Sequence, residues 1–94
     1  MESLIGKEHA GYTFVAQKPY SDRDDEPCIV VLGVRPDRDG WQFVTWIYNP
    51  STTGYFWGSY GLEVTKREAV KCGLLDFDER GLAGQAGASL FIAP

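Results

Sequence analysis

The middle third of the chain alternates strand-like runs with short turns, and this pattern constrains the fold more than any other feature. Cys28–Val34 reads CIVVLGV, a continuous apolar run of strand length that is typical of a strand buried on both faces. Arg35–Gly40 ends in Asp-Gly, a strong hairpin signal, and Asn49–Gly54 is the next turn. Two further strands are expected after these turns, at Trp41–Tyr48 and Tyr55–Tyr60. Strands joined by such short turns run antiparallel, so the pattern predicts a meander.

The residues before this region predict one more strand. Tyr12–Gln17 (YTFVAQ) is rich in β-forming side chains and alternates weakly. Lys18–Pro27 follows as a charged segment bracketed by prolines, which indicates a loop. Residues 1–11 form a short lead-in, in which one helical turn could begin near Ser3.

One helix is predicted after the meander. The run from Thr65 to Glu68 fits a capping box, in which the Thr hydroxyl accepts from the amide three residues on and the Glu side chain reaches back. Apolar residues then recur at helical spacing, namely Val70, Leu74 and Phe77. We expect the helix to cover Lys66–Arg80 and to end at Gly81 in a left-handed cap, with Gly73 as its weak point.

The remaining residues, 81–94, form a Gly-rich tail that reads as a flexible connector. Within this tail, Ser89–Ile92 could add a fifth strand at the edge of the sheet. A chain of 94 residues is the size of one domain. The expected fold is therefore a single small α+β domain over residues 1–94, in which an antiparallel meander of about four strands carries one helix on one face.

Both faces of the predicted sheet are apolar. If Tyr48 pairs with Tyr55 and Val34 with Trp41, alternation along each strand sorts the side chains into two sets. The first set comprises Cys28, Val30, Leu32, Val34, Trp41, Phe43, Ile47, Phe56 and Tyr60. The second set comprises Ile29, Val31, Val44, Trp46, Tyr48, Tyr55 and Trp57, with Gln42 and Ser59 at the edge. One helix covers roughly one face of a four-stranded sheet, and we expect it on the first, more aliphatic set.

The second face then carries an aromatic ladder with no obvious cover, formed by Trp46, Tyr48, Tyr55 and Trp57. Trp and Tyr suit a partly wet surface because each has an apolar body and a polar tip. Two interpretations remain open. In one, the ladder is an exposed platform that binds a protein partner or a second copy of the chain. In the other, the lead-in and the tail fold over the ladder and make it a second core, since cross-strand aromatic pairs also stabilise sheets.

Catalytic and metal-binding patterns are absent from the sequence. His9 is the single histidine, and no nucleophile–base pair can be assembled with it. Two cysteines, Cys28 and Cys72, together with one histidine do not make a zinc set. The glycines of the tail match no nucleotide-binding motif. We therefore expect no enzyme activity, no metal and no cofactor.

The formal net charge of −4 argues against duplex DNA and anionic membranes, because both are bound by clustered Lys and Arg. The acidic residues outside the predicted strands offer an alternative function: Asp22, Asp24, Asp25, Glu26, Asp37 and Asp39 could steer a small inhibitor toward the basic groove of a nucleic-acid-binding protein. A third alternative is single-stranded nucleic acid or a flat ligand stacked on the ladder, although only Lys18, Arg35 and Arg38 are plausible cations there. No signal peptide or membrane-length apolar run is visible, which predicts a cytoplasmic protein.

The string W-x-Y-N-P-x-x-x-G-Y-F-W-G-x-Y at Trp46–Tyr60, followed by the capped helix, resembles a motif of small proteins of bacteria and of their phages and mobile elements, a family of unknown function. The resemblance covers Trp41–Arg80 and leaves out the acidic loop and the Gly-rich tail. It implies a compact β-meander plus helix, and it transfers no activity.

Overall fold

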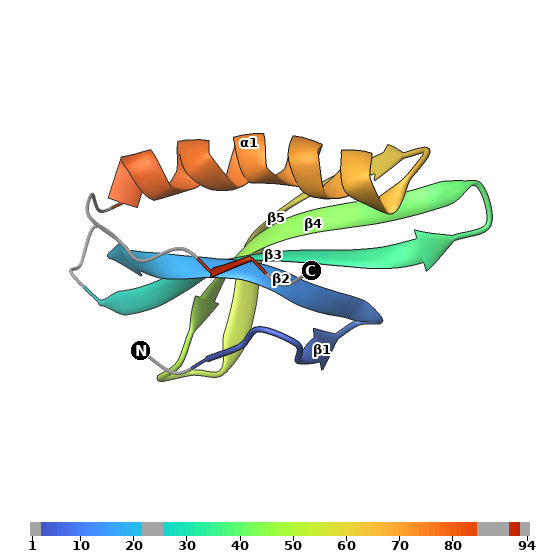
Figure 1. The fold of residues 1–94 in the computed structure, drawn as a ribbon. Coiled ribbons are helices and arrows are strands. Elements are labelled where there is room, and N and C mark those ends of the chain that lie inside the picture. Colours follow the sequence, from blue (N-terminus) through green and yellow to red (C-terminus); the bar gives the residue numbers. More distant parts are fainter. Residues whose placement is uncertain (1–2, 22–25, 85–90, 93–94) are drawn as a thin grey trace.

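The protein folds into one antiparallel sheet with a helix on one face (Figure 1). The structure is a computed structural model that describes residues 3–21, 26–84 and 91–92. Its elements are β1 (Glu8–His9), β2 (Tyr12–Ser21), β3 (Pro27–Asp37), β4 (Gly40–Asn49), β5 (Gly54–Glu63), α1 (Lys66–Gly84) and β6 (Phe91–Ile92). The strand order is β1-β2-β3-β4-β5, and β6 pairs with the same edge of β2 that β1 uses. The predicted α+β meander with one helix is confirmed.

Strand β2 continues through a segment that the sequence assigned to a loop. Lys18 pairs with Val30 of β3, and the pairing runs on to Ser21. The Lys18 ammonium lies 4.7 Å from the centroid of the Phe77 ring and 3.4 Å from the Asp78 carboxylate, both on α1. The predicted loop is therefore wrong over residues 18–21. Its charged lysine does not indicate a solvated loop, because the side chain lies against the helix. Residues 22–25 of the expected loop lie outside the described residues.

Strands β3 and β4 keep their predicted faces. Tyr48 pairs with Tyr55, as expected. Val34 pairs with Phe43 rather than with Trp41, because β3 and β4 both extend farther into the expected turn. This difference is two residues, an even number, so each side chain of β3 and β4 stays on its predicted face.

Helix α1 begins as the capping box predicts and ends later than expected. The Glu68 amide donates to the Thr65 hydroxyl over 3.1 Å, which confirms the threonine half of the predicted capping box. The helix continues to Gly84, so the predicted end at Gly81 is wrong; a glycine inside a helix costs only about 1 kcal/mol relative to alanine. Gly73 is buried against the Leu32 side chain, so it is a packing position rather than a weak point.

The core between α1 and the sheet is the predicted aliphatic one. Its buried members are Val15, Ala16, Cys28, Val30, Leu32, Val34, Phe43, Ile47, Ala69 and Phe77. Val70 and Leu74, from the predicted helical stripe, pack against it and are half-buried. Phe56 and Trp41 do the same from the sheet. We call this the helix-side core.

Candidate functional site

A second hydrophobic core fills the face of the sheet opposite α1. Its buried members are Leu4, Tyr12, Phe14, Ile29, Val31, Val44, Trp46 and Tyr48. The lead-in closes it: the Leu4 amide donates to the Oε1 of buried Gln17 over 2.5 Å, and β1 pairs with the start of β2. Figure 1 shows this N-terminal segment on the side of the sheet away from α1. The interpretation in which the lead-in covers the ladder is therefore the correct one for this face.

Trp46, the first residue of the predicted platform, is enclosed by rings and is only 6% exposed. The centroid of its ring lies 5.3 Å from that of His9, 5.4 Å from Tyr12 and 5.4 Å from Tyr55. The Trp46 indole N–H also donates to the Tyr60 hydroxyl over 3.1 Å. An indole with ring contacts on several sides and a paired N–H belongs to a core.

The predicted exposed platform is therefore wrong at two of its four positions. Trp46 and Tyr48 are buried, Tyr55 is half-buried, and Trp57 alone is well exposed. Tyr48 and Tyr55 do pair across the strands, with ring centroids 4.7 Å apart. The tail, which was the other candidate cover, pairs through β6 with the outer edge of β2. The physical reason for the correction is that the described part of the lead-in, residues 3–11, turns back over this face.

A β-bulge in β5 separates Trp57 from Trp46. Thr45 pairs with Ser59 and Ile47 pairs with Phe56, so two β5 residues, Trp57 and Gly58, lie opposite Trp46 alone. The bulge reverses the predicted faces beyond it: Tyr60 lies opposite Val44 on the second-core face, whereas it was expected on the helix face, and Ser59 changes face in the opposite sense.

Gly58 makes this bulge possible. A Cβ at Gly58 would come within 2.8 Å of the Trp46 Nε1 and within 2.7 Å of the Tyr60 hydroxyl oxygen. A side chain at this position would therefore collide with the hydrogen bond that joins Trp46 and Tyr60. A glycine inside a strand is a known sequence signal for a bulge, and it was the signal that could have located this one.

Trp57 has a backbone conformation that is unusual for a large side chain. Its φ is 55°, in the left-handed region, and its side chain is 59% exposed. The one ring pair that it forms among the described residues is an edge contact with Phe56, at 5.1 Å. The residue is thus strained and poorly packed at the same time.

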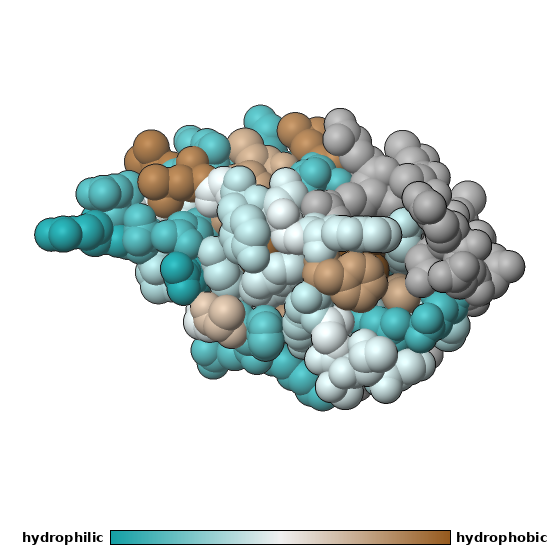
Figure 2. Space-filling model, turned by 180° about the vertical axis from the view of Figure 1, so that it is seen from behind, coloured by the Kyte–Doolittle hydropathy of each residue, from teal (hydrophilic) through white to brown (hydrophobic). Residues whose placement is uncertain are grey.

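Two further apolar side chains of β5 share this exposure, and neither was predicted. Tyr60 is 62% exposed and Leu62 is 50% exposed. We call Trp57, Tyr60 and Leu62 the β5 strip. Among the described residues, β5 pairs with β4 on one side, and no strand pairs with its other edge. Figure 2 shows the back of the molecule, where β5 lies; the middle of this side is pale, between the hydrophilic and hydrophobic ends of the scale.

A polar network beside the second core fixes the orientation of Tyr12. The Tyr12 hydroxyl donates to the Gln42 side-chain oxygen over 2.8 Å, and the Arg35 Nε donates to the same oxygen over 3.1 Å. The Arg35 guanidinium also lies 4.7 Å from the centroid of the Tyr12 ring. Burial raises the pKa of the Tyr12 hydroxyl above its ordinary value of 10.0, and the nearby positive charge of Arg35 opposes this rise.

The predicted acidic set does not come together among the described residues. Glu26 precedes β3 and accepts a hydrogen bond from the side-chain Nδ2 of Asn49, whereas Asp37 ends β3 and Asp39 lies in the next turn. A strand of this length separates its two ends by about 30 Å, at about 3.3 Å per residue. Asp22, Asp24 and Asp25 lie outside the described residues.

The cations expected for nucleic-acid binding are mostly engaged elsewhere. Lys18 contacts Phe77 and Asp78 of the helix. Arg35 is held by Gln42 and by the carbonyl of Ala10, to which it donates over 3.0 Å. Arg38 is exposed in the β3–β4 turn.

In the part of the chain that the structure describes, no three His, Cys, Asp or Glu side chains gather as metal ligands. No described helix has the length and apolar character needed to cross a membrane. Comparison with family models, with curated proteins and with solved structures finds no match, so the resemblance of Trp46–Tyr60 to the bacterial and phage motif stays a prediction.

Proposed function

We propose that the protein is a non-enzymatic interaction module that pairs with a second copy of itself through the free edge of β5. The observation that carries this proposal is that Trp57 combines an exposed side chain with a strained, left-handed backbone. A left-handed backbone costs an L-residue about 1–2 kcal/mol, and an exposed indole recovers little of this by burial. Strain of this kind collects at functional positions. Trp is also among the residues most enriched at binding hot spots.

The edge of β5 lacks most of the features that keep sheet edges apart. Natural edge strands are blunted by lysines, prolines, inward-pointing charges or β-bulges, and of these β5 has the bulge alone. Of the ten residues of β5, Glu63 alone is charged, and it lies at the end of the strand. The bulge at Trp57 and Gly58 shapes this edge without adding charge.

A second copy fits this edge better than a basic partner does. The whole chain carries a formal charge of −4, yet the β5 strip is uncharged, so two copies can approach there with little repulsion. A two-fold axis through the middle of an antiparallel β5 pair, between Gly58 and Ser59, brings Trp57 of each copy opposite Tyr60 of the other. The same axis separates the two Glu63 carboxylates, because each lies opposite Gly54.

Sedimentation velocity over a wide concentration range, at low and at high salt, tests the proposal. The wild-type protein is expected to dimerise with little salt dependence. Trp57→Gly should weaken dimerisation about 30-fold, which corresponds to about 2 kcal/mol for a hot-spot residue. Leu75→Ser is the matched control, because Leu75 is 65% exposed and lies on α1 rather than on β5, so its loss should leave dimerisation unchanged.

Two results would contradict self-association through β5. One is a wild-type protein that stays monomeric at the highest concentration. The other is a Trp57→Gly protein that dimerises as well as the wild type. A dimer that dissociates in high salt would point to charged surfaces instead, which is the behaviour expected of the acidic-inhibitor alternative.

A further inference from the structure

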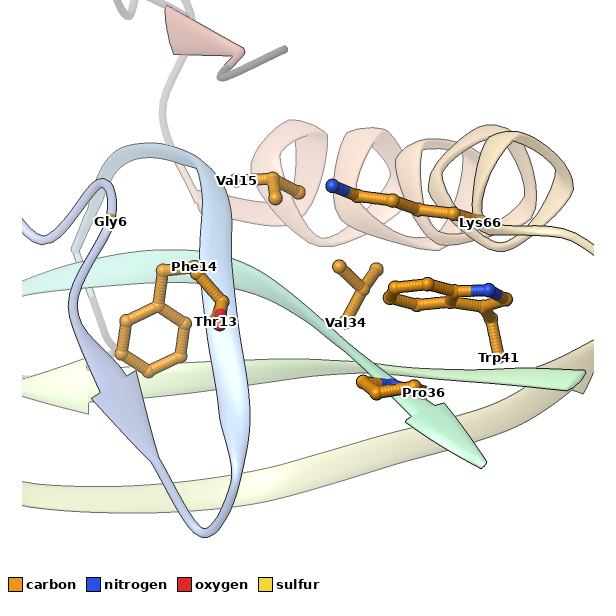
Figure 3. A pocket seen from close by; sticks show the side chains of 8 residues that line it. All are labelled: Gly6, Thr13, Phe14, Val15, Val34, Pro36, Trp41 and Lys66. Carbon is orange, nitrogen blue, oxygen red and sulfur yellow. The ribbon is translucent and has the colours of Figure 1, made fainter. Parts of the chain in front are cut away.

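A pocket of about 340 Å³ opens where the N-terminus of α1 meets the ends of β3 and β4 (Figure 3). Its floor and walls include Val15 from β2, Val34 and Pro36 from β3, and Trp41 from β4. Lys66, the first residue of α1, closes one side. None of the residues that line the pocket belongs to the β5 strip, so it is a separate site from the proposed dimer edge.

The described residues that line the pocket are mostly apolar, with Thr13 as a polar exception, and the single charged one among them, Lys66, is positive. Val15 and Val34 are buried, and Trp41 is half-buried. In Figure 3 the Lys66 side chain runs past the Trp41 indole and its ammonium points toward Val15. The ammonium is 5.6 Å from the Trp41 ring centroid, and it forms no ion pair with any described carboxylate.

We propose that this pocket binds a small ligand that has a flat, apolar body and one carboxylate group. Small-molecule sites are typically concave and mostly apolar, hold at least about 300 Å³, and fix the ligand with a few polar groups. Here the apolar body of the ligand would lie against the Trp41 indole and the two valines. Its carboxylate would pair with the exposed Lys66 ammonium.

The position of the bulge in β2 explains why a space exists at this point. The pairing of β2 with β3 shifts between Phe14 and Ala16, which leaves Val15 without a partner in β3. On the outer edge of β2, β1 pairs as far as Thr13 and β6 pairs from Ala16 onward. The pocket therefore lies beside an interruption in the sheet, where regular packing is broken.

Chemical-shift titration of the ¹⁵N-labelled protein with phenylacetate tests the proposal, with phenylacetamide as the neutral probe of the same shape. Phenylacetate should shift the Trp41 indole N–H resonance and the Val15 and Val34 resonances. Lys66→Gln should weaken this binding about fivefold, the upper end for a solvent-accessible ion pair. Lys66→Arg should retain it, because the charge is kept.

The matched control is Lys71→Gln, which removes an exposed lysine of α1 that does not line the pocket and should leave the affinity unchanged. Phenylacetamide should bind the wild type about as weakly as phenylacetate binds Lys66→Gln. The proposal is overturned if phenylacetate leaves the three pocket resonances unmoved. It is equally overturned if wild type and Lys66→Gln bind phenylacetate with the same affinity.

Discussion

The sequence placed Trp46 and Trp57 in the same aromatic ladder. In the structure one is buried and the other exposed, so we expect their loss to change the free energy of unfolding by very different amounts. Truncating a buried Trp to Ala costs about 3–5 kcal/mol, and Trp46 is enclosed by rings and hydrogen-bonded to Tyr60. A domain of this length has a free energy of unfolding of about 5–14 kcal/mol, at about 0.05–0.15 kcal/mol per residue. Trp46→Ala should therefore remove a large share of the stability.

Trp57→Gly should change the free energy of unfolding by about 1 kcal/mol or less. The edge contact with Phe56 is worth about 0.5–1.5 kcal/mol, and its loss is offset by relief of a left-handed backbone that costs about 1–2 kcal/mol. Urea denaturation followed by circular dichroism, at a fixed low protein concentration, measures both variants. The reasoning is refuted if Trp57→Gly is as destabilising as Trp46→Ala, or if Trp46→Ala is as stable as the wild type.

Two further perturbations test the packing of α1 and the burial of Tyr12. Gly73→Ala should lower the free energy of unfolding by about 1–3 kcal/mol in urea, although Ala favours helices, because the new methyl would run into buried Leu32; a gain in stability would contradict this packing. Because burial raises the pKa of Tyr12, the folded state keeps a proton that the unfolded state loses, so the free energy of unfolding should fall as the pH rises above 10.0. Tyr12→Phe should flatten that fall in denaturation curves measured on either side of this pH, and an unchanged slope would speak against it.

Much of the architecture is readable from local sequence. The apolar run at Cys28–Val34, the turn residues after it and the Thr65 cap are each decided by neighbours within a few positions. These features predicted the meander, the helix and the two faces of β3 and β4. The face assignment survived an error in the first hairpin, because the register differs by an even number of residues.

The errors at the candidate site have two physical causes. One is the bulge at Trp57 and Gly58, which changes the face of Tyr60 and depends on a single backbone conformation rather than on a repeating pattern. The other is the return of the lead-in, whose Leu4 contacts residues far along the chain. Periodicity predicts which side chains of a strand lie on each face of the sheet, but it does not predict which distant segment covers that face.

Hydrogen exchange at the β5 amides that point away from β4 is the most direct test of self-association through this edge. If two copies pair there, exchange at these amides should slow as the protein concentration rises, and Trp57→Gly should move this slowing to about 30-fold higher concentration. If these amides exchange at the same rate at every concentration, the edge of β5 is not the surface that joins two copies.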